Sequence, residues 1–282
     1  MKRVTALLAM SSVALVSTPG TNAQIEEPPP AWAYPVNPPD FKLPPDDGTL
    51  RRVPGSTAAF TLTQLRDRFF APDWHPGDHP PMPEVVARGR RPEVFACGFC
   101  HRADGPGGPE NSNLAGLPAP YISQQMREFK SGARQTSVPG RNVDLMISLA
   151  KAATDAEVEA AAAYFSALKP RAVIKVVEAD TVPRTYVTGW HLAASSTGGR
   201  EPIGQRIVEV PEDLERFVSR DARSRFIAYV PPGAVQKGQA LAASGGGGKT
   251  VQCGVCHGTD LKGLGPIPGI AGRSPSYIVR QL

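Results

Sequence analysis

The chain has 282 residues, enough for about two domains of average size, and 20% of its residues are charged. The formal net charge is only +5 and no run of basic residues occurs, so nucleic acid is not predicted as a partner. All four cysteines fall in two Cys-x-x-Cys-His motifs. A disulfide inside either motif would close too small a loop to stabilise a fold by much.

Residues 1–23 have the layout of a secretory signal peptide. A basic start is followed by an apolar run of 13 residues, from Val4 to Val16, and then by small and polar residues up to Ala23. A membrane-spanning helix needs about 20 apolar residues, and no later segment has them. We therefore predict export to the periplasm, with no membrane-spanning segment after the signal is removed.

Residues 24–80 are predicted to form a proline-rich arm. Of the 30 prolines, 14 fall between residues 28 and 83, where few apolar residues recur with a helical or strand period. One short amphipathic helix is expected within residues 60–70, FTLTQLRDRFF. His75 and His79 have the chemistry of metal ligands, but histidines in exposed loops are the more common interpretation.

The motifs at residues 97–101, CGFCH, and 253–257, CGVCH, lie 156 positions apart. A thioredoxin-like motif needs a strand before it, and zinc ligand pairs usually lie closer in sequence. Neither alternative explains the histidine after each pair, whereas covalent haem attachment explains every position. We predict two covalently attached c-type haems; their thioether cysteines and iron-binding histidines are Cys97, Cys100, His101, Cys253, Cys256 and His257.

A sixth ligand, commonly methionine, completes the iron site of an electron carrier. Met146 follows a loop with proline and glycine and precedes a helix that opens with a capping box, Thr154 to Glu157. We expect Met146 to be a loop residue that binds the iron of haem 1, with gap-filling in the core as the alternative. Met126, on one face of a predicted helix, and Met82 are expected to pack.

Residues 171–231 separate the two motif-bearing segments and have a different pattern. Their β-branched and aromatic residues alternate or cluster between turn signals, which predicts a small β-rich insert of two hairpins. His191 is expected on a strand face, with metal binding as the alternative. In residues 233–282, the stretch AVQKGQALA is predicted to open a second helical domain, and Gly245 to Gly248 to form a flexible loop.

The two motifs belong to a longer repeat. An ungapped offset of 156 aligns about thirty positions, which indicates duplicated domains. The matched pairs include Asp104 with Asp260, Ala115 with Ala271, Tyr121 with Tyr277, and Gln125 with Gln281. The counterpart of Met146 would be position 302, so we expect the sequence to be a fragment that lacks roughly 45 residues of its second domain. A second haem with an open iron position is the alternative.

Residues 97–134 and 144–168 resemble the two-haem class I cytochromes c of the c-four group. The resemblance rests on the haem motif, the LAG turn at 114–116, the helix of Tyr121, Met146 and the AAYF segment. It implies a mainly α fold with two cytochrome c domains, here at 82–170 and, incomplete, at 233–282. This chain departs from the family in two further ways. Ser112 occupies a position where the family often has proline, whereas the second copy has proline there, Pro268. The family also lacks the long insert.

These observations predict a periplasmic carrier of single electrons, or the cytochrome subunit of a dehydrogenase. Its partners would be redox proteins such as a periplasmic dehydrogenase or a terminal oxidase, and it would need no catalytic acid, base or nucleophile. Methionine on the iron should raise the reduction potential. The alternative is a haem enzyme, either a peroxidase or a sulfur-compound oxidase, with an open second haem.

Overall fold

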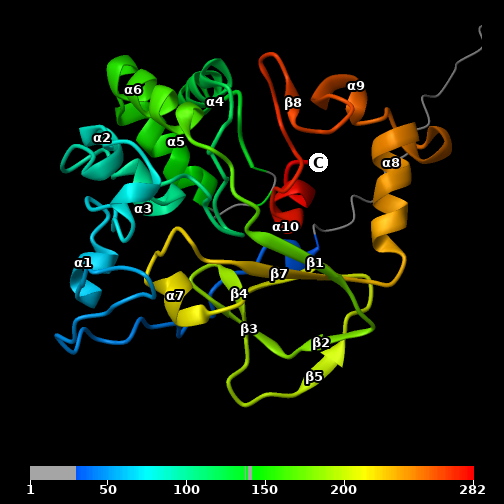
Figure 1. Cartoon of the computed structure of the whole chain (residues 1–282), viewed down its shortest axis with the longest axis horizontal. Coiled ribbons are helices and arrows are strands. Elements are labelled where there is room, and N and C mark those ends of the chain that lie inside the picture. The colour runs from blue at the N-terminus through cyan, green and yellow to red at the C-terminus, as the bar shows by residue number, and fades with distance from the viewer. Residues whose placement is uncertain (1–29, 137, 139–141) are drawn as a thin grey trace, which may run out of the picture.

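The computed structural model describes residues 30–136, 138 and 142–282, so the predicted signal peptide and most of the loop before Met146 lie outside it. Within the described residues, no helix combines the length and the apolar character needed to cross a membrane. Helices gather in one half of the molecule and strands in the other (Figure 1).

The arm contains more structure than its composition predicts. Its elements are the short turns η1 (Ala31–Ala33) and η2 (Pro76–Asp78) and the helix α1 (Leu62–Arg66). The α1 helix confirms the prediction for residues 60–70, and a capping box of Thr61 and Gln64 starts it. Trp74 and Leu65 are buried in a small apolar cluster beside it. Residues 51–78 therefore form a folded segment with its own apolar cluster, and not the expected extended arm.

The first motif forms the helix α3 (Cys97–His101). The helices around it are α2 (Glu84–Ala87), α4 (Ala119–Ser131), α5 (Asn142–Ala152) and α6 (Asp155–Ala167). The α4 helix ends at Gly132, whose φ of 80° is the left-handed cap that glycine favours, and α6 begins at the predicted capping box. Phe165 of α6 is fully buried in the core that these helices share.

The predicted β-rich segment contains strands throughout. A mixed sheet has the order β1 (Ile174–Glu178), β7 (Phe226–Val230), β6 (Val208–Pro211); two further pairs join β2 (Thr181–Pro183) to β5 (Arg200–Pro202) and β3 (Thr185–Thr188) to β4 (His191–Ala194). Only β3 and β4 form a hairpin of consecutive strands, because β2 pairs with β5 across them and β1 pairs with β7 in parallel, so the expectation of two hairpins is wrong for the rest of the segment. The short helix α7 (Leu214–Val218) lies between β6 and β7.

The second motif lies at the end of the chain, after α8 (Ala234–Gly248). It forms α9 (Gly254–His257), followed by β8 (Gly263–Leu264), β9 (Ile267–Pro268) and α10 (Pro275–Val279). The predicted opening helix is confirmed as α8. The glycine run is a left-handed turn at its end, with φ values of 66°, 62° and 74° at Gly245 to Gly247. The α10 helix contacts β6 and η1, so this segment reaches back to the middle of the molecule (Figure 1).

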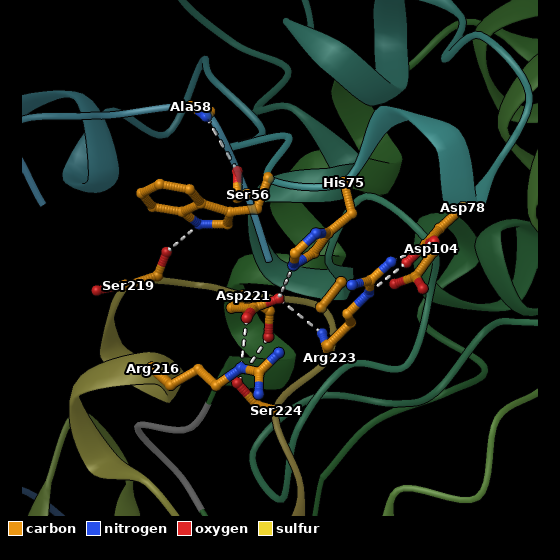
Figure 2. Close-up of polar contacts among 12 residues, drawn as sticks. Ser56, Ala58, His75, Asp78, Asp104, Arg216, Ser219, Asp221, Arg223 and Ser224 are labelled. Carbon is orange, nitrogen blue, oxygen red and sulfur yellow. Dashed lines mark hydrogen bonds and ion pairs between the residues drawn. The ribbon is translucent and has the colours of Figure 1, made fainter. Parts of the chain in front are cut away.

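The arm and the insert meet around the buried carboxylate of Asp221 (Figure 2). Its Oδ1 accepts a hydrogen bond from Nε2 of His75 at 3.1 Å, and its Oδ2 pairs with Arg216. Nearby, the indole N–H of Trp74 donates to the carbonyl of Ser219 at 2.7 Å. His79 bonds Asp73 through a side chain that is only 4% exposed. The expectation of exposed loop histidines is therefore wrong. The side chains of His75 and His79 are both buried, and each forms a hydrogen bond with a carboxylate that packs beside it.

Candidate haem-attachment sites

The first site is built on one helical turn. The α3 helix carries Cys97, Cys100 and His101, with both thiols partly exposed and the imidazole buried. Nδ1 of His101 lies 2.9 Å from the carbonyl oxygen of Ser112. Burial lowers the pKa of His101, which favours the neutral ring. A neutral ring that donates from Nδ1 presents the Nε2 lone pair, which is the form that a metal ion binds.

The loop after α3 has a backbone that brings Ser112 to the imidazole. Arg102 ends the helix with a φ of 68°, and the N–H of Gly107 bonds the carbonyl of His101 at 3.0 Å. Gly107 itself has a φ of 65°. A Cβ there would lie 2.6 Å from the carbonyl oxygens of both Asn111 and Ser112. Only glycine allows this close approach, so Gly107 fixes the position of the carbonyl that orients His101.

The second site repeats this geometry. Nδ1 of His257, at the end of α9, lies 2.7 Å from the carbonyl oxygen of Pro268. His257 and Pro268 are separated by the same number of residues as His101 and Ser112. The serine at 112 therefore supplies the carbonyl that a proline supplies in the second copy. Cys256 is exposed and Cys253 partly so, which makes this site more open than the first.

The residues present fit a covalently attached haem at both positions. Each motif offers two unbridged thiols on one helical turn and an imidazole whose Nδ1 is already engaged by a carbonyl. Among the described residues, no hydrogen bond involves the Nε2 atom of either ring. This donor set suits attachment through two thioethers with iron bound by Nε2.

Met146 lies within α5 and not in a loop, so that part of the prediction is wrong. The segment from Asn142 onward lacks glycine and proline and is rich in good helix formers, so the helix starts before the methionine. The side chain of Met146 is partly buried. The role of Met146 as an iron ligand stays a prediction. Met82 packs against the apolar clusters on both sides of α3, as expected for a packing residue.

Two arginines lie beside the first site, Arg102 buried and Arg220 partly buried. Arg102 is 3% exposed, lies 5.0 Å from the ring centroid of Phe217 and pairs loosely with Glu110 at 3.8 Å. Arg220 lies 3.6 Å from the ring centroid of Phe99 and donates to the Phe99 carbonyl at 2.9 Å. Burial lowers the pKa of both guanidinium groups. Positive charge held here favours the less positive, reduced state of a neighbouring iron.

His191 occupies the strand face that was expected for it. Its ring packs edge-on against Phe217, with 4.5 Å between centroids, and its Nδ1 lies 3.3 Å from the carbonyl of Gly189. Burial lowers the pKa of His191. Across the described ranges, no group of three or more metal-binding side chains is found.

Sequence reasoning missed the arginines that cross between the two sites, Arg134 and Arg273. The first copy has leucine, Leu117, at the position equivalent to Arg273. This difference could have pointed to Arg273 from the sequence alone. A charged residue in one copy and an apolar residue at the equivalent position of the other indicate that the two positions have different surroundings.

Thiols and a carbonyl-held imidazole on one helical turn define a domain that attaches haem covalently. Residues 86–169 match the family described as Cytochrome c. Cytochrome c-554(548) of Halomonas halodenitrificans (strain ATCC 12084 / NCIMB 8669) is 32% identical over 75 residues, which are 26% of this chain and 86% of that protein. The chain belongs to the cytochrome c family, and this confirms the resemblance seen in the sequence.

Two other relatives carry the name thiosulfate dehydrogenase electron acceptor. The protein of Thiomonas intermedia (strain K12) is 42% identical over 81 residues, 28% of this chain and 34% of that protein. The protein of Stutzerimonas stutzeri (strain A1501) is 26% identical over 197 residues, 69% of this chain and 64% of that protein. The chain thus spans about a third of the first relative and just under two thirds of the second.

Two solved structures show weaker similarity. Thiosulfate dehydrogenase (TsdBA) from Marichromatium purpuratum in its as-isolated form gives a TM-score of 0.42 at 24% identity, over 70% of this chain and 30% of that one. The cytochrome c4 of Acidithiobacillus ferrooxidans gives 0.40 at 23% identity, over 66% of this chain and 77% of that one. Both TM-scores are below 0.5, so no argument rests on them.

Proposed function

We propose that the protein is a periplasmic two-haem cytochrome that passes single electrons between redox partners. The observation that carries the proposal is the repeated geometry: each Cys-x-x-Cys-His motif places its histidine Nδ1 within 2.9 Å of a backbone carbonyl 11 residues further on. Chance occurrences of the motif would not reproduce this second contact. The haem supplies the one-electron chemistry, and the protein supplies ligands, burial and charge.

The roles of the residues follow from these contacts. Cys97 and Cys100 would hold one haem, Cys253 and Cys256 the other, and His101 and His257 would bind the two irons. Met146 is proposed as the second iron ligand of haem 1. The chain's own contribution is to orient each imidazole through a carbonyl and, at the first site, to place the charges of Arg102, which is buried, and Arg220, which is partly buried, nearby.

The partner we propose is a dehydrogenase that oxidises an inorganic sulfur compound. Two relatives are named as electron acceptors of thiosulfate dehydrogenase, and the match to one of them extends over 197 residues. The segment from residue 86 to 169 would then accept electrons by the same means as in those proteins. The second candidate function is a haem enzyme at the second site, and the exposure of Cys256 is the observation that favours it.

The test starts with a haem count on the mature, exported chain. We expect two haems per chain, and one after the double substitution Cys253→Ala and Cys256→Ala. Near-infrared magnetic circular dichroism should show a methionine-to-iron band that the substitution Met146→Ala removes. The native protein should be reduced when a thiosulfate-oxidising dehydrogenase and thiosulfate are both supplied, and not by thiosulfate alone. Turnover of thiosulfate or peroxide by this chain alone would favour the enzyme instead.

A further inference from the structure

The two copies of the repeat face each other through equivalent residues. Gln125 and Gln281 occupy the same repeat position, and one guanidinium, that of Arg134, donates to both side-chain oxygens at 2.5 and 2.6 Å. Tyr121 and Tyr277 are a second equivalent pair, and both lie near the guanidinium of Arg273. Contacts between equivalent residues are expected where two duplicated units meet around an approximate two-fold axis.

Arg273 makes the same kind of bridge between backbone carbonyls. Its Nη1 donates to the carbonyl of Asn113 at 2.7 Å, and its Nε donates to the carbonyl of Gly269 at 3.2 Å. Asn113 and Gly269 occupy the same position of the repeat. A third bond runs from Nη2 to the carbonyl of Ala115 at 3.3 Å. One side chain from the second copy therefore holds the same loop in both copies.

These loops are the ones that orient the two histidines. Asn113 directly follows Ser112, whose carbonyl is 2.9 Å from Nδ1 of His101. Gly269 directly follows Pro268, whose carbonyl is 2.7 Å from Nδ1 of His257. A continuous chain of bonds therefore leads from one imidazole through a carbonyl, one residue of backbone and the guanidinium to the other imidazole.

Arginine is suited to this position in a way that lysine is not. Its planar fork presents five N–H donors in fixed directions, so three carbonyls can be held with one rigid group. A lysine ammonium carries the same charge as a point at the end of a flexible chain, and it does not reproduce the fork. Arg273 is partly buried, and burial lowers its pKa.

We propose that Arg273 is a positioning residue that joins the two iron-binding histidines into one unit, so that a change at either haem alters the ligand geometry at the other. The inference rests on the proposed two-haem function. It concerns the coupling of the two sites, and it predicts that loss of one guanidinium disturbs both.

The experiment uses the haem-loaded full chain with the substitutions Arg273→Gln and Arg273→Lys. Electron paramagnetic resonance of the oxidised protein reports the ligand geometry of each haem, and a spectroelectrochemical titration reports the two midpoint potentials. We expect both variants to shift the g-values of both haems and to weaken the dependence of one haem's potential on the redox state of the other.

Arg134→Gln is the matched control. It removes a guanidinium that also bridges equivalent residues of the two copies, but its partners are side chains that do not touch the histidine loops. We expect wild-type g-values and potentials from this variant. If Arg134→Gln disturbs both haems as much as Arg273→Gln does, the effect is a general loosening of the contact, and the inference is wrong.

Two other results would also overturn it. Full recovery of wild-type behaviour in Arg273→Lys would mean that charge alone acts, and a shift confined to the haem of His257 would mean a local effect. A wild-type haem count of one would contradict the two-haem proposal itself, and that count is made separately. If the variants fail to take up haem, the wild-type protein provides the test. Hydrogen exchange measured by nuclear magnetic resonance should show that the guanidinium N–H protons of Arg273 exchange slowly with water. Rapid exchange would contradict the hydrogen bonds from Arg273 to the two loops.

Discussion

At the scale of single residues, the proximal imidazoles are oriented by backbone and not by side chains. The carbonyl of Ser112 does at the first site what the carbonyl of Pro268 does at the second. The identity of the side chain at position 112 is therefore free, whereas Gly107 is constrained because a Cβ there would collide with two carbonyls.

This contrast gives the first prediction. Ser112→Ala should leave the spectrum and potential of haem 1 unchanged, because the accepting carbonyl stays in place. Gly107→Ala should lower the free energy of unfolding by more than about 1 kcal/mol, since the backbone has a positive φ and no space for a methyl group. Denaturant unfolding and a redox titration of both variants measure the difference. A shift in potential in Ser112→Ala would contradict the assignment of the carbonyl.

The second prediction concerns Asp221, whose side chain is completely buried. It bonds His75 and Arg216 and also accepts from the backbone N–H of Arg223 at 2.8 Å (Figure 2). Asp221→Ala leaves these donors without a partner, and removing one member of a buried charged pair destabilises by about 3–5 kcal/mol.

Asp155→Ala is the control for this substitution. Its carboxylate is 91% exposed and 3.8 Å from Lys130, so its loss should cost well under about 1 kcal/mol. Urea unfolding of both variants gives the comparison. Equal stabilities would show that the contacts of Asp221 do not hold the arm to the insert.

At the scale of elements, the sequence predicted those helices and strands that depend on interactions between residues close together in the chain. The capping box at Thr154, the amphipathic segment that became α1 and the alternating strands of residues 171–231 were all readable, because each depends on neighbours close in sequence. The parallel pairing of β1 with β7 was not, since more than 40 residues separate the two strands.

The same limit explains the errors at the candidate sites. The proline and glycine before Met146 predict a loop there, but α5 begins at Asn142. The sequence around His75 gives no sign of burial, because its partner, Asp221, lies 146 residues away. The proposed haem-attachment residues follow from a five-residue motif, whereas their carbonyl partners and the bridging arginines depend on how distant segments pack.

The third prediction tests the start of α6. The hydroxyl of Thr154 accepts from the N–H of Glu157 at 3.2 Å, and the Glu157 carboxylate bonds the N–H of Thr154 at 2.8 Å. Thr154→Ala should lower the free energy of unfolding by about 1 kcal/mol without changing the haem spectrum. Thr154→Ser, which keeps the hydroxyl, is the control. A spectral change in Thr154→Ala would mean that the cap also positions Met146 or its helix.

Glu157 makes the stability of α6 depend on pH in the acid range. A hydrogen bond from Arg90 at 2.9 Å, followed by those from Thr154, holds the pKa of Glu157 below its usual range. A carboxyl with a lowered pKa stabilises the fold above its unfolded pKa, and this contribution is lost as the pH falls. The stability difference between wild type and Glu157→Gln should therefore shrink in acid, below about pH 4.5.

At the scale of the whole molecule, the last turn of the chain is held by the sheet. Glu209 of β6 is 3% exposed, and its Oε2 accepts from the hydroxyls of Ser274 and Ser276 at 2.6 and 2.7 Å. Arg280, which follows α10 directly, is the charged group that acts on Glu209, and His191 of β4 lines the same small cavity. Burial raises the pKa of Glu209 above its usual value, and the serine bonds only partly oppose this effect.

The fourth prediction follows from the sign of that shift. An acid whose pKa is higher in the folded than in the unfolded state keeps its proton longer when folded, so stability falls as the pH rises from about 4.5 through the folded pKa. Glu209→Gln, which is neutral at every pH, should flatten this part of the stability profile and be more stable than wild type at pH 8. Urea unfolding from pH 4.5 to 8 measures both profiles. An unchanged slope would assign the pH dependence to another group, and a loss of stability at all pH values would mean that α10 requires the carboxyl group of Glu209 in either protonation state.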